Sequence, residues 1–488
     1  MQEKELFDLV AKIRERRAEG QWTEVKAARE GCPGKLYDTL SSFSNQDEGG
    51  VIVFGVDEKN GCEVCGVYDA QDLQHRVGEQ CKQMEPVVRA VFTVARVEGK
   101  TVVSAEIPGV EAAVRPVFYR GAGRLKGSWV RVGDADEPMT EGEVYAYEAF
   151  RKRVHDDLRC AEGVEMGDLD EGLLGAYVER AKRERPNLAA SVGRGEILER
   201  MGVTRGGQPT LAGVLMFTRY PQTWYPQLCI TGVVVPGSKM GETGPGGERF
   251  SDNRRFTGPL PEMVREACDF VARNTRAATV IGEDGRRADR EEYPARAIRE
   301  AVLNAVLHRD YSFYAENTPV RIEIYVDRME IQNEGGLFGR TTLGGLGKIR
   351  PDTRNAVLAN ILEVMRETEN RYSGIPTILA ECEANGLPVP RFESARGTFR
   401  VTFWPRRGRE GAERFDRKKA EDSLLAYCRT PRSREELVAF VGMSRFYVMG
   451  HFVRPLVESG QLKMTHPETP KSKGQRFVTA DKATEERP

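Results

Sequence analysis

Hydrophobic and polar positions in the first 147 residues predict a mixed α/β domain. Amphipathic patterns over 5–17 and 35–43 predict two helices, with a strand over 22–26 between them. The apolar run 49–57, entered by two glycines, is typical of a buried central strand. Further strands are predicted over 87–97, 101–107, 115–119 and 128–133. A sheet with helices is therefore expected here.

A different pattern sets three polar residues four positions apart in an apolar helix. Glu300, Asn304 and His308 must share one helical face, while residues 298–307 are otherwise mostly apolar. A carboxylate can orient or deprotonate a water, and an amide oxygen can ligate a magnesium ion that bridges phosphates. This face predicts a nucleotide pocket or, alternatively, a polar edge that only meets water.

The residues that follow favour the pocket. Strand-like segments at 320–326 and 329–331 lead to the glycine turn Asn333-Glu-Gly335-Gly336, and Ser373-Gly374 opens another helix. In this order the elements resemble the GHKL type of ATP site, in the divergent form of RecG-like ATP-binding regulators. The resemblance runs from about 210 to 403 and includes Phe256-Thr-Gly-Pro-Leu260, Tyr293-Pro-x-x-Ala-Ile-Arg-Glu300, His308-Arg-Asp-Tyr311, Arg354-Asn355 and Gly386-Leu-Pro-x-Pro390.

The resemblance implies that this region binds ATP or ADP with magnesium. Glu300 would be the catalytic, water-orienting base and Asn304 the magnesium ligand. The other implied nucleotide-binding residues are His308 on the same face, Asn333 at the adenine amino group, Gly335 and Gly336 where the backbone approaches the nucleotide, and Ser373 and Gly374 near the phosphates. Asn333 replaces the Asp of stricter ATPases, and Tyr372 replaces a glycine. Both departures favour binding over hydrolysis.

The first domain also carries ordered motifs, Thr23-Glu24-Val-Lys26, Phe43-Ser-Asn45, Gly49-Gly50, Gly55-Val-Asp57, Pro116-x-x-Tyr119 and Val130-Arg-Val-Gly133. Together they resemble the Schlafen/AlbA-type nucleic-acid-binding domain. Basic side chains offer phosphate contacts and aromatic rings stack on unpaired bases. The candidates are Lys26, Arg115, Tyr119, Lys126 and Arg131. The alternative is a solvated loop beside core aromatics.

Three acids of this domain occupy the places of the metal-binding triad of Schlafen-type nucleases. They are Glu19, Glu24 and Asp57. By this resemblance they would be catalytic, would hold Mg²⁺ or Mn²⁺, and would cleave RNA or single-stranded nucleic acid. In the structural alternative, Glu19 lies on a solvated helix end and Asp57 caps the turn before Asn60-Gly61.

The last segment, 412–488, predicts a winged helix-turn-helix. Helices are expected at 420–428, 433–440 and 445–453, and strands at 462–465 and 476–478. In such a fold the second helix of the motif enters the major groove and a wing meets phosphates. The DNA-facing candidates are Arg445, Tyr447 and His451 on the helix, and Lys471 and Lys473 on the wing. A protein-interaction module is the alternative.

Composition adjusts this interpretation. The formal net charge of −1 argues against a tail-driven nucleic-acid binder, but residues 406–488 hold 18 Lys and Arg against 12 Asp and Glu, a net +6. Nine cysteines, an odd number, and no signal-like apolar start predict a reducing, cytoplasmic setting without disulfides. No apolar run approaches the roughly 20 residues of a membrane span.

At 488 residues the chain has room for three or four domains of ~100–200 residues. The predicted fold class is an α+β multidomain protein: a Schlafen/AlbA-type domain at 1–147, a helical connector at 148–208, a GHKL-like α/β sandwich at 209–405 and the winged helix at 412–488.

The primary hypothesis is a nucleotide-binding, DNA-binding transcriptional regulator that binds duplex DNA and acts as a homodimer or higher homo-oligomer. The alternatives are a metal-dependent nuclease acting on RNA and gated by nucleotide, and a non-catalytic assembly protein with a decayed ATP site.

Overall fold

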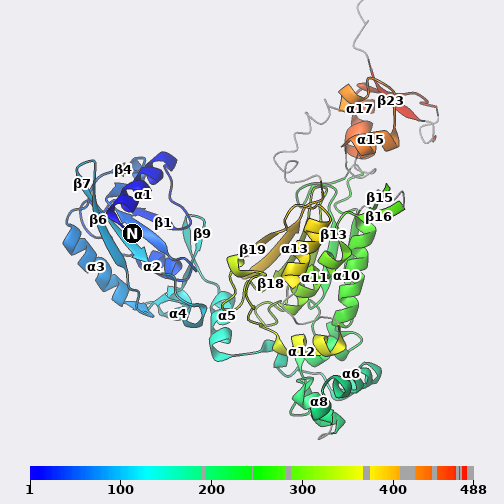
Figure 1. Ribbon diagram of the computed structural model, residues 1–488, viewed down its shortest axis with the longest axis horizontal. Helices are drawn as coiled ribbons and strands as arrows, with labels where there is room; N and C mark the ends of the chain where they lie inside the picture. The colour runs from blue at the N-terminus through cyan, green and yellow to red at the C-terminus, as the bar shows by residue number, and fades with distance from the viewer. Residues whose placement is uncertain are drawn as a thin grey trace, which may run out of the picture. The chain divides into compact units, whose positions relative to one another are not determined.

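The computed structural model describes residues 1–189, 193–244, 246–275, 277–281, 287–366, 374–406, 424–441, 448–468, 472 and 475–480. The chain forms two compact units. The first combines Met1–Asp156 with Leu337–Arg354, and the second combines Asp157–Gly336 with Asn355–Pro488. Figure 1 shows the helices and strands coloured along the chain from the N-terminus to the C-terminus.

The first unit is built on a four-stranded sheet in the order β1-β2-β7-β6. Its strands are β1 (Thr23–Lys26), β2 (Gly50–Phe54), β6 (Val91–Val97) and β7 (Lys100–Ile107). β1 runs parallel to β2, and the other neighbours are antiparallel. The predicted helices, central strand and hairpin are therefore present, with ends shifted by a few residues.

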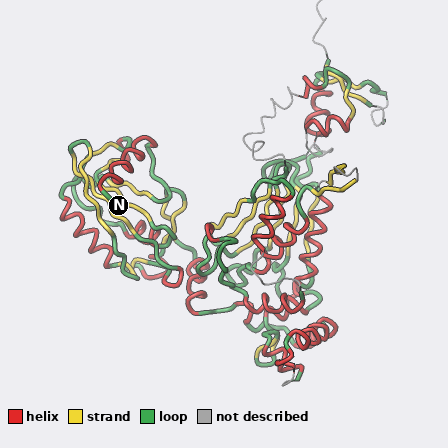
Figure 2. Tube along the Cα trace, viewed as in Figure 1, coloured by secondary structure: helices red, strands yellow, loops and turns green. Residues whose placement is uncertain are grey.

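Helices cover both faces of this sheet (Figure 2). α1 (Glu3–Arg16) packs on one face, in a core that includes Val53, while α2 (Tyr37–Ser44) and α3 (Ala70–Lys82) pack on the other with Ile52 and Phe54. Successive strand residues point to opposite faces, so the apolar run of β2 contributes to both cores.

The predicted strand 49–57 is interrupted at Gly55, whose φ is 94°. β3 (Val56–Asp57) follows it. Gly49 also has a positive φ, of 70°, and a Cβ there would lie 2.1 Å from Ile107 O. Only glycine accepts that backbone and that approach. The smaller elements of the unit are η1 (Glu58–Asn60), β4 (Glu63–Val64), β5 (Met84–Glu85), η2 (Ala112–Val114), β8 (Phe118–Tyr119), α4 (Gly123–Gly127), β9 (Trp129–Val132), β10 (Ala135–Pro138) and α5 (Glu141–Lys152).

The second unit contains a six-stranded mixed sheet in the order β14-β13-β17-β18-β20-β19. Its strands are β13 (Ile230–Val234), β14 (Asp252–Phe256), β17 (Val320–Ile324), β18 (Met329–Glu334), β19 (Arg391–Ala395) and β20 (Thr398–Phe403). Three helices lie together against it (Figure 1): α10 (Leu260–Asn274), α11 (Ala295–Leu307) and α13 (Gly374–Ala384). One continuous hydrophobic core joins the sheet to these helices.

Further elements complete the second unit. They are η3 (Asp156–Leu158), which begins at the last residue of the first unit, η4 (Met166–Asp168), α6 (Glu171–Glu184), α7 (Pro186–Ala189), α8 (Arg194–Arg200), β11 (Thr204–Arg205), β12 (Gln208–Pro209), α9 (Leu211–Phe217), η5 (Pro221–Thr223), β15 (Ala277–Ile281), β16 (Arg287–Glu291) and α12 (Ala356–Met365). The short η6 (Leu343–Gly345) belongs to the first unit. The predicted division into four domains stays a prediction.

The described C-terminal elements have a core of their own. A helical segment at 424–427 precedes β21 (Arg432–Ser433), α15 (Arg434–Val441), the π-helix η8 (Val448–Val453), α17 (Arg454–Glu458), β22 (Leu462–Met464) and β23 (Arg476–Thr479). The strands form a three-stranded sheet in the order β21-β23-β22. Within the described parts of the whole chain, no helix is long and apolar enough to cross a membrane.

Candidate functional site

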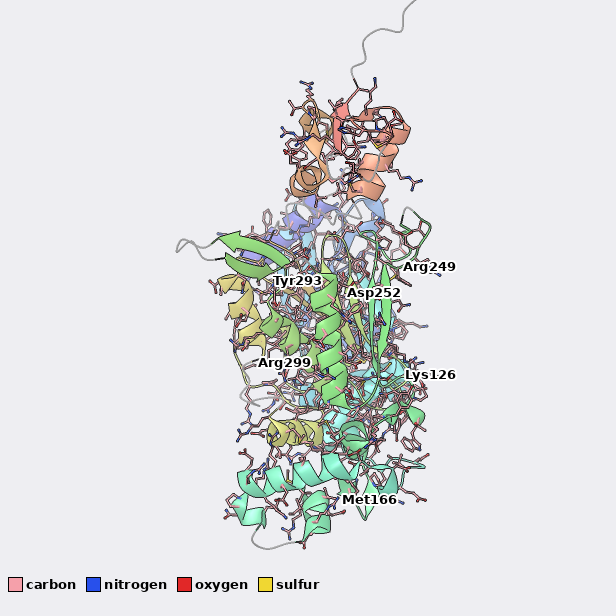
Figure 3. All side chains as sticks on the ribbon, turned by 90° about the vertical axis from the view of Figure 1, so that its right-hand side faces the viewer. Lys126, Met166, Arg249, Asp252, Tyr293 and Arg299 are labelled. Carbon is pink, nitrogen blue, oxygen red and sulfur yellow. The ribbon has the colours of Figure 1, made fainter. Side chains whose placement is uncertain are left out.

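The polar line on α11 is present in the structure. Between residues 297 and 307 only Arg299, Glu300 and Asn304 are not buried, and His308 ends the helix half-exposed. Tyr293, just before the helix, is buried, and its ring lies 6.3 Å from that of Phe403 at 74° (Figure 3). The aromatic contact and the apolar circumference fix α11, so that its polar line faces away from the core.

Gly374, the first residue of α13, lies against this polar line. A Cβ on Gly374 would be 2.9 Å from Asn304 Nδ2 and 3.3 Å from Glu300 Oε2. A side chain at position 374 would therefore require the Asn304 amide to move. The structure thus brings together three predicted residues from two elements. Ser373, the remaining phosphate-side prediction, lies outside the described residues.

The glycine turn after β18 packs closely against other parts of the second unit. Gly335 has a φ of 96°, and a Cβ there would lie 2.6 Å from the backbone nitrogen of Asp310. Asp310 N in turn donates to Glu334 O at 2.8 Å. The fold itself therefore requires a glycine at 335, and the contact of Gly335 and Gly336 with a nucleotide stays a prediction. Gly336 likewise faces Ser394, whose Oγ would lie 2.9 Å from a Cβ.

Asn333 is buried on β18, with a relative exposure of 3%. Its Nδ2 donates to Glu334 O at 2.9 Å and to Gly335 O at 3.3 Å. The amide is thus held by the turn that follows it. Its contact with an adenine amino group stays a prediction.

Two residues that sequence reasoning gave no role organise the end of α11. Asn355 Nδ2 donates to Leu307 O at 2.8 Å and to Arg309 O at 2.7 Å, so it satisfies carbonyls beyond the last helical turn. Arg309 is itself buried, donates to Ala315 O at 2.9 Å, and has its pKa lowered by that burial. The only sequence signal was their membership of the two motifs His308-Arg-Asp-Tyr311 and Arg354-Asn355.

The acids of the first unit surround Arg131. Its Nη1 lies 2.9 Å from Glu24 Oε2 and 3.0 Å from Asp136 Oδ1, and its Nη2 lies 3.8 Å from Glu19 Oε2. The Arg131 side chain is 1% exposed, and Lys26 pairs with Glu24 from the other side. The Glu24 contact is an ion pair without hydrogen-bond geometry. This cluster neutralises itself inside the fold.

The pKa of Glu19 is raised to about 7, mainly because the side chain is buried and also because the Glu24 carboxylate is near, while the hydrogen bond from Val25 N opposes the shift. Asp57 is placed differently. Its carboxylate accepts from Lys59 N at 3.1 Å and Asn60 Nδ2 at 2.6 Å, which is the turn-capping role that the structural alternative expected.

Glu19, Glu24 and Asp57 were expected to converge on a metal ion. Among the described residues, which include all three, no group of three His, Cys, Asp or Glu side chains could hold one. The reason is local: Arg131 engages the two glutamates, and the 3₁₀ turn engages Asp57. The expected acidic triad is therefore not assembled.

The predicted nucleic-acid contacts of the first unit separate by burial. Arg115 is buried and pairs with Asp47 at 2.8 Å, and Arg131 is buried as described, so neither presents its charge at the surface. Burial does not favour the contacts predicted for these two arginines, and those contacts stay a prediction. Tyr119 stacks on Tyr37 with ring centroids 3.8 Å apart. Lys126, labelled in Figure 3, is exposed and fits the expected surface role.

The predicted DNA contacts of the last segment fall largely on undescribed positions. Arg445, Tyr447, Lys471 and Lys473 lie outside the described residues. His451 falls within η8 (Val448–Val453), but its side chain is also outside what the structure describes.

Two families match the chain. Residues 19–140 match Schlafen, AlbA_2, and residues 317–403 match the family described as putative ATP-dependent DNA helicase recG C-terminal. The first match runs through the sheet and Arg131 of the first unit, and the second runs from β17 to β20. The protein is thus a mixed α/β multidomain protein with an AlbA_2 domain and a HATPase-like domain.

Two solved structures share similarity with it. The DIP2311 protein from Corynebacterium diphtheriae is 18% identical, with a TM-score of 0.39 over 94% of this chain and 93% of that one. The N-terminal domain of a putative ATP-dependent DNA helicase RecG-related protein from Nitrosomonas europaea is 23% identical, with a TM-score of 0.23 over 27% of this chain and 91% of that one. No curated protein matches the chain. The two domain assignments therefore rest on the family matches.

Proposed function

We propose that the protein is a nucleotide-binding, DNA-binding transcriptional regulator whose nucleotide site is formed by α11 and α13. The observation that carries this proposal is the meeting of Glu300, Asn304 and Gly374. A carboxylate and an amide on one helix are brought together with a glycine at the start of another helix, 70 or more positions further along the chain.

The arrangement suits ATP or ADP with magnesium. α13 begins at Gly374, and the first N–H groups of a helix have no partner within it and carry a partial positive charge, which favours phosphate. Because Gly374 has no Cβ, a phosphate could approach the backbone at the start of α13 more closely than it could beside any other residue. Asn304 would supply an oxygen ligand to magnesium, and Glu300 would orient a water.

Titration calorimetry with ATP and magnesium on the full chain tests this site. We expect wild type to bind, Asn304→Ala to lose the magnesium-dependent part of the affinity, and Glu300→Gln to keep binding while losing any hydrolysis. If wild type gives no heat at millimolar ATP with magnesium, the site has decayed and the assembly-protein alternative is the better one.

DNA binding is proposed for the C-terminal segment as a winged helix. The described order of helix, strand, three helical segments and two strands supports this fold, as does the sheet β21-β23-β22. Ser433 and Glu436 form a reciprocal cap at the start of α15, with Ser433 N donating at 2.8 Å and Glu436 N at 3.2 Å. The net +6 of residues 406–488 would attract phosphates.

Fluorescence anisotropy with duplex DNA at several salt concentrations tests this part. The logarithm of affinity should fall with the logarithm of salt by roughly 0.9 per phosphate neutralised. Arg445→Ala should cost about 1–3 kcal/mol on a specific sequence, whereas Lys471→Ala should weaken all sequences alike. If the affinity for DNA does not change with salt concentration, or if no DNA binds at low salt, the alternative that the C-terminal segment is a protein-interaction module is the better one.

A further inference from the structure

One segment leaves the HATPase-like domain and belongs to the other unit. Leu337–Arg354, here called the strap, follows the glycine turn Gly335-Gly336 and precedes Asn355, yet it is part of the compact unit formed with Met1–Asp156. The sequence prediction placed all of 209–405 in one domain. The strap is thus the stretch where the polypeptide passes from the candidate nucleotide site to the first unit and back.

The strap is seated on α5 (Glu141–Lys152) and the residues just after it. The Phe338 ring meets the Phe150 ring edge-on, with centroids 5.5 Å apart, and the Arg354 guanidinium lies 4.7 Å from the centre of the Phe338 ring. Gly339 passes so close that a Cβ would lie 2.7 Å from Phe150 Cε2. His155 Nδ1 lies 3.2 Å from Arg354 O. Both ends of the strap are therefore held at one place on the first unit.

An ion pair between Arg340 and Asp352 joins the two ends of the strap, here called its base. Arg340 binds Asp352 with Nε at 3.1 Å and Nη2 at 2.9 Å, and Arg340 N also donates to Asp352 Oδ2 at 2.8 Å. These hydrogen bonds from Arg340 lower the pKa of Asp352. Three bonds between the same two residues make the base of the strap move as one piece.

The chain on either side of the strap is fixed to the end of α11. Before it, Gly335 packs against Asp310 N with no room for a Cβ. After it, Asn355 binds Leu307 O and Arg309 O. Both attachments lie within a few residues of the C-terminal end of the helix that carries Glu300 and Asn304. The residues that flank the strap in sequence are therefore both attached to the end of α11.

We propose that the strap couples nucleotide binding to the first unit: occupancy of the Glu300–Asn304 site changes the packing of Phe338 on α5. This inference rests on the proposed function. Packed contacts change between discrete arrangements and do not deform continuously, so a small shift at the site can be passed to α5. Coupling between two sites is reciprocal, which means that a ligand of the first unit changes nucleotide affinity by the same factor.

Hydrogen–deuterium exchange on the full chain tests the coupling. With ATP and magnesium, wild type should become protected at residues 295–307, which reports binding. It should also change exchange at 141–152 by about fivefold or more, the lower end of typical couplings. In Phe338→Ala the response at 295–307 should persist and that at 141–152 should vanish. Phe7→Ala, an exposed phenylalanine on α1 of the same unit, is the matched control and should behave as wild type.

The outcomes separate the two proposals. Protection at 295–307 without any change at 141–152 in wild type would overturn the coupling and leave nucleotide binding standing. No protection at either place would overturn both. Asn355→Ala, compared with wild type without nucleotide, removes one attachment of the strap and should speed exchange at 141–152. If Asn355→Ala shows a cooperative thermal unfolding transition, and is therefore folded, but exchanges at 141–152 at the same rate as wild type, the coupling proposal is wrong. That conclusion would not depend on the effect of nucleotide.

Discussion

Two polar clusters in this protein use similar residues for different ends. In the first unit, Glu19 and Glu24 meet Arg131, a buried cation more than 100 residues away. In the second unit, Glu300 and Asn304 meet Gly374, which has no side chain to offer them. The acids of the first cluster contact a buried cation of the fold, whereas the polar pair of the second contacts a glycine backbone at a helix start. The distant residue that faces a pair of polar side chains therefore decides which interactions they can make.

The largest effect should come from removing the cation of the first cluster. Arg131→Met leaves Glu19, Glu24 and Asp136 around an apolar side chain, and breaking a buried ion pair from one side costs about 3–5 kcal/mol. Urea unfolding, followed by a probe in the first unit, would measure this loss. Lys126→Met, at an exposed lysine, is the control. A loss below about 1 kcal/mol would mean that the cluster contributes little to stability.

A smaller effect should follow from the protonation of Glu19. Its pKa rises from 4.5 in the unfolded chain to about 7 in the fold, so folding takes up a proton between these values. The resulting stability is fully present below pH 4.5 and is lost as the pH rises through about 7. Glu19→Gln should remove this slope, on the order of 1.4 kcal/mol per pH unit at most. Unfolding of both proteins at several pH values checks it, and parallel curves would contradict it.

In the second cluster, Gly374→Ala should weaken nucleotide binding by about tenfold, or about 1.4 kcal/mol. The added methyl would lie 2.9 Å from Asn304 Nδ2 and would hinder the close approach of a phosphate to the start of α13. Calorimetry with ATP and magnesium measures the change. Gly175→Ala, at a helical glycine with nothing within 4 Å, is the control for a helix glycine. If wild type, Gly374→Ala and Gly175→Ala bind ATP with equal affinity, Gly374 is not part of the nucleotide site.

The smallest effect is expected at Lys126. Because it is exposed, Lys126→Ala should change stability by no more than about 0.5 kcal/mol. If it meets a phosphate, binding of single-stranded RNA should lose roughly 0.7 from its log–log salt slope. Anisotropy titrations at several salt concentrations would show this. An unchanged slope would leave the first unit without a tested nucleic-acid contact.

Local patterns were enough to predict much of the fold. The buried strand β2 and the polar line of α11 follow from spacing within one element, where side-chain direction is fixed by backbone geometry. The meeting of Gly374 with Asn304 depends on tertiary packing and was anticipated only through resemblance. For such contacts the sequence alone supplies no distance.

Burial of charge could not be predicted from the sequence. In the sequence, Arg115, Arg131 and Lys126 are all basic residues close to aromatic ones. In the folded protein, however, Arg115 forms an ion pair with Asp47 and Arg131 forms one with Glu24. The sequence also could not show that residues 337–354 pack with the first unit. Their pattern of hydrophobic and polar residues does not indicate that Phe338 contacts Phe150. Both arrangements involve partners far away along the chain.

Because the hydrogen bonds between Arg340 and Asp352 join the two ends of the strap, the packing of these ends on α5 does not depend on how many residues lie between them. Closure of a loop costs entropy that grows only with the logarithm of its length, about 0.6 kcal/mol for each doubling. The base is held by three hydrogen bonds between those two residues, while Leu343 and Ile349 on the intervening stretch are 45% and 52% exposed. Relatives can therefore lengthen or shorten this stretch at little thermodynamic cost, and a reporter peptide inserted after Gly347 should leave the base closed.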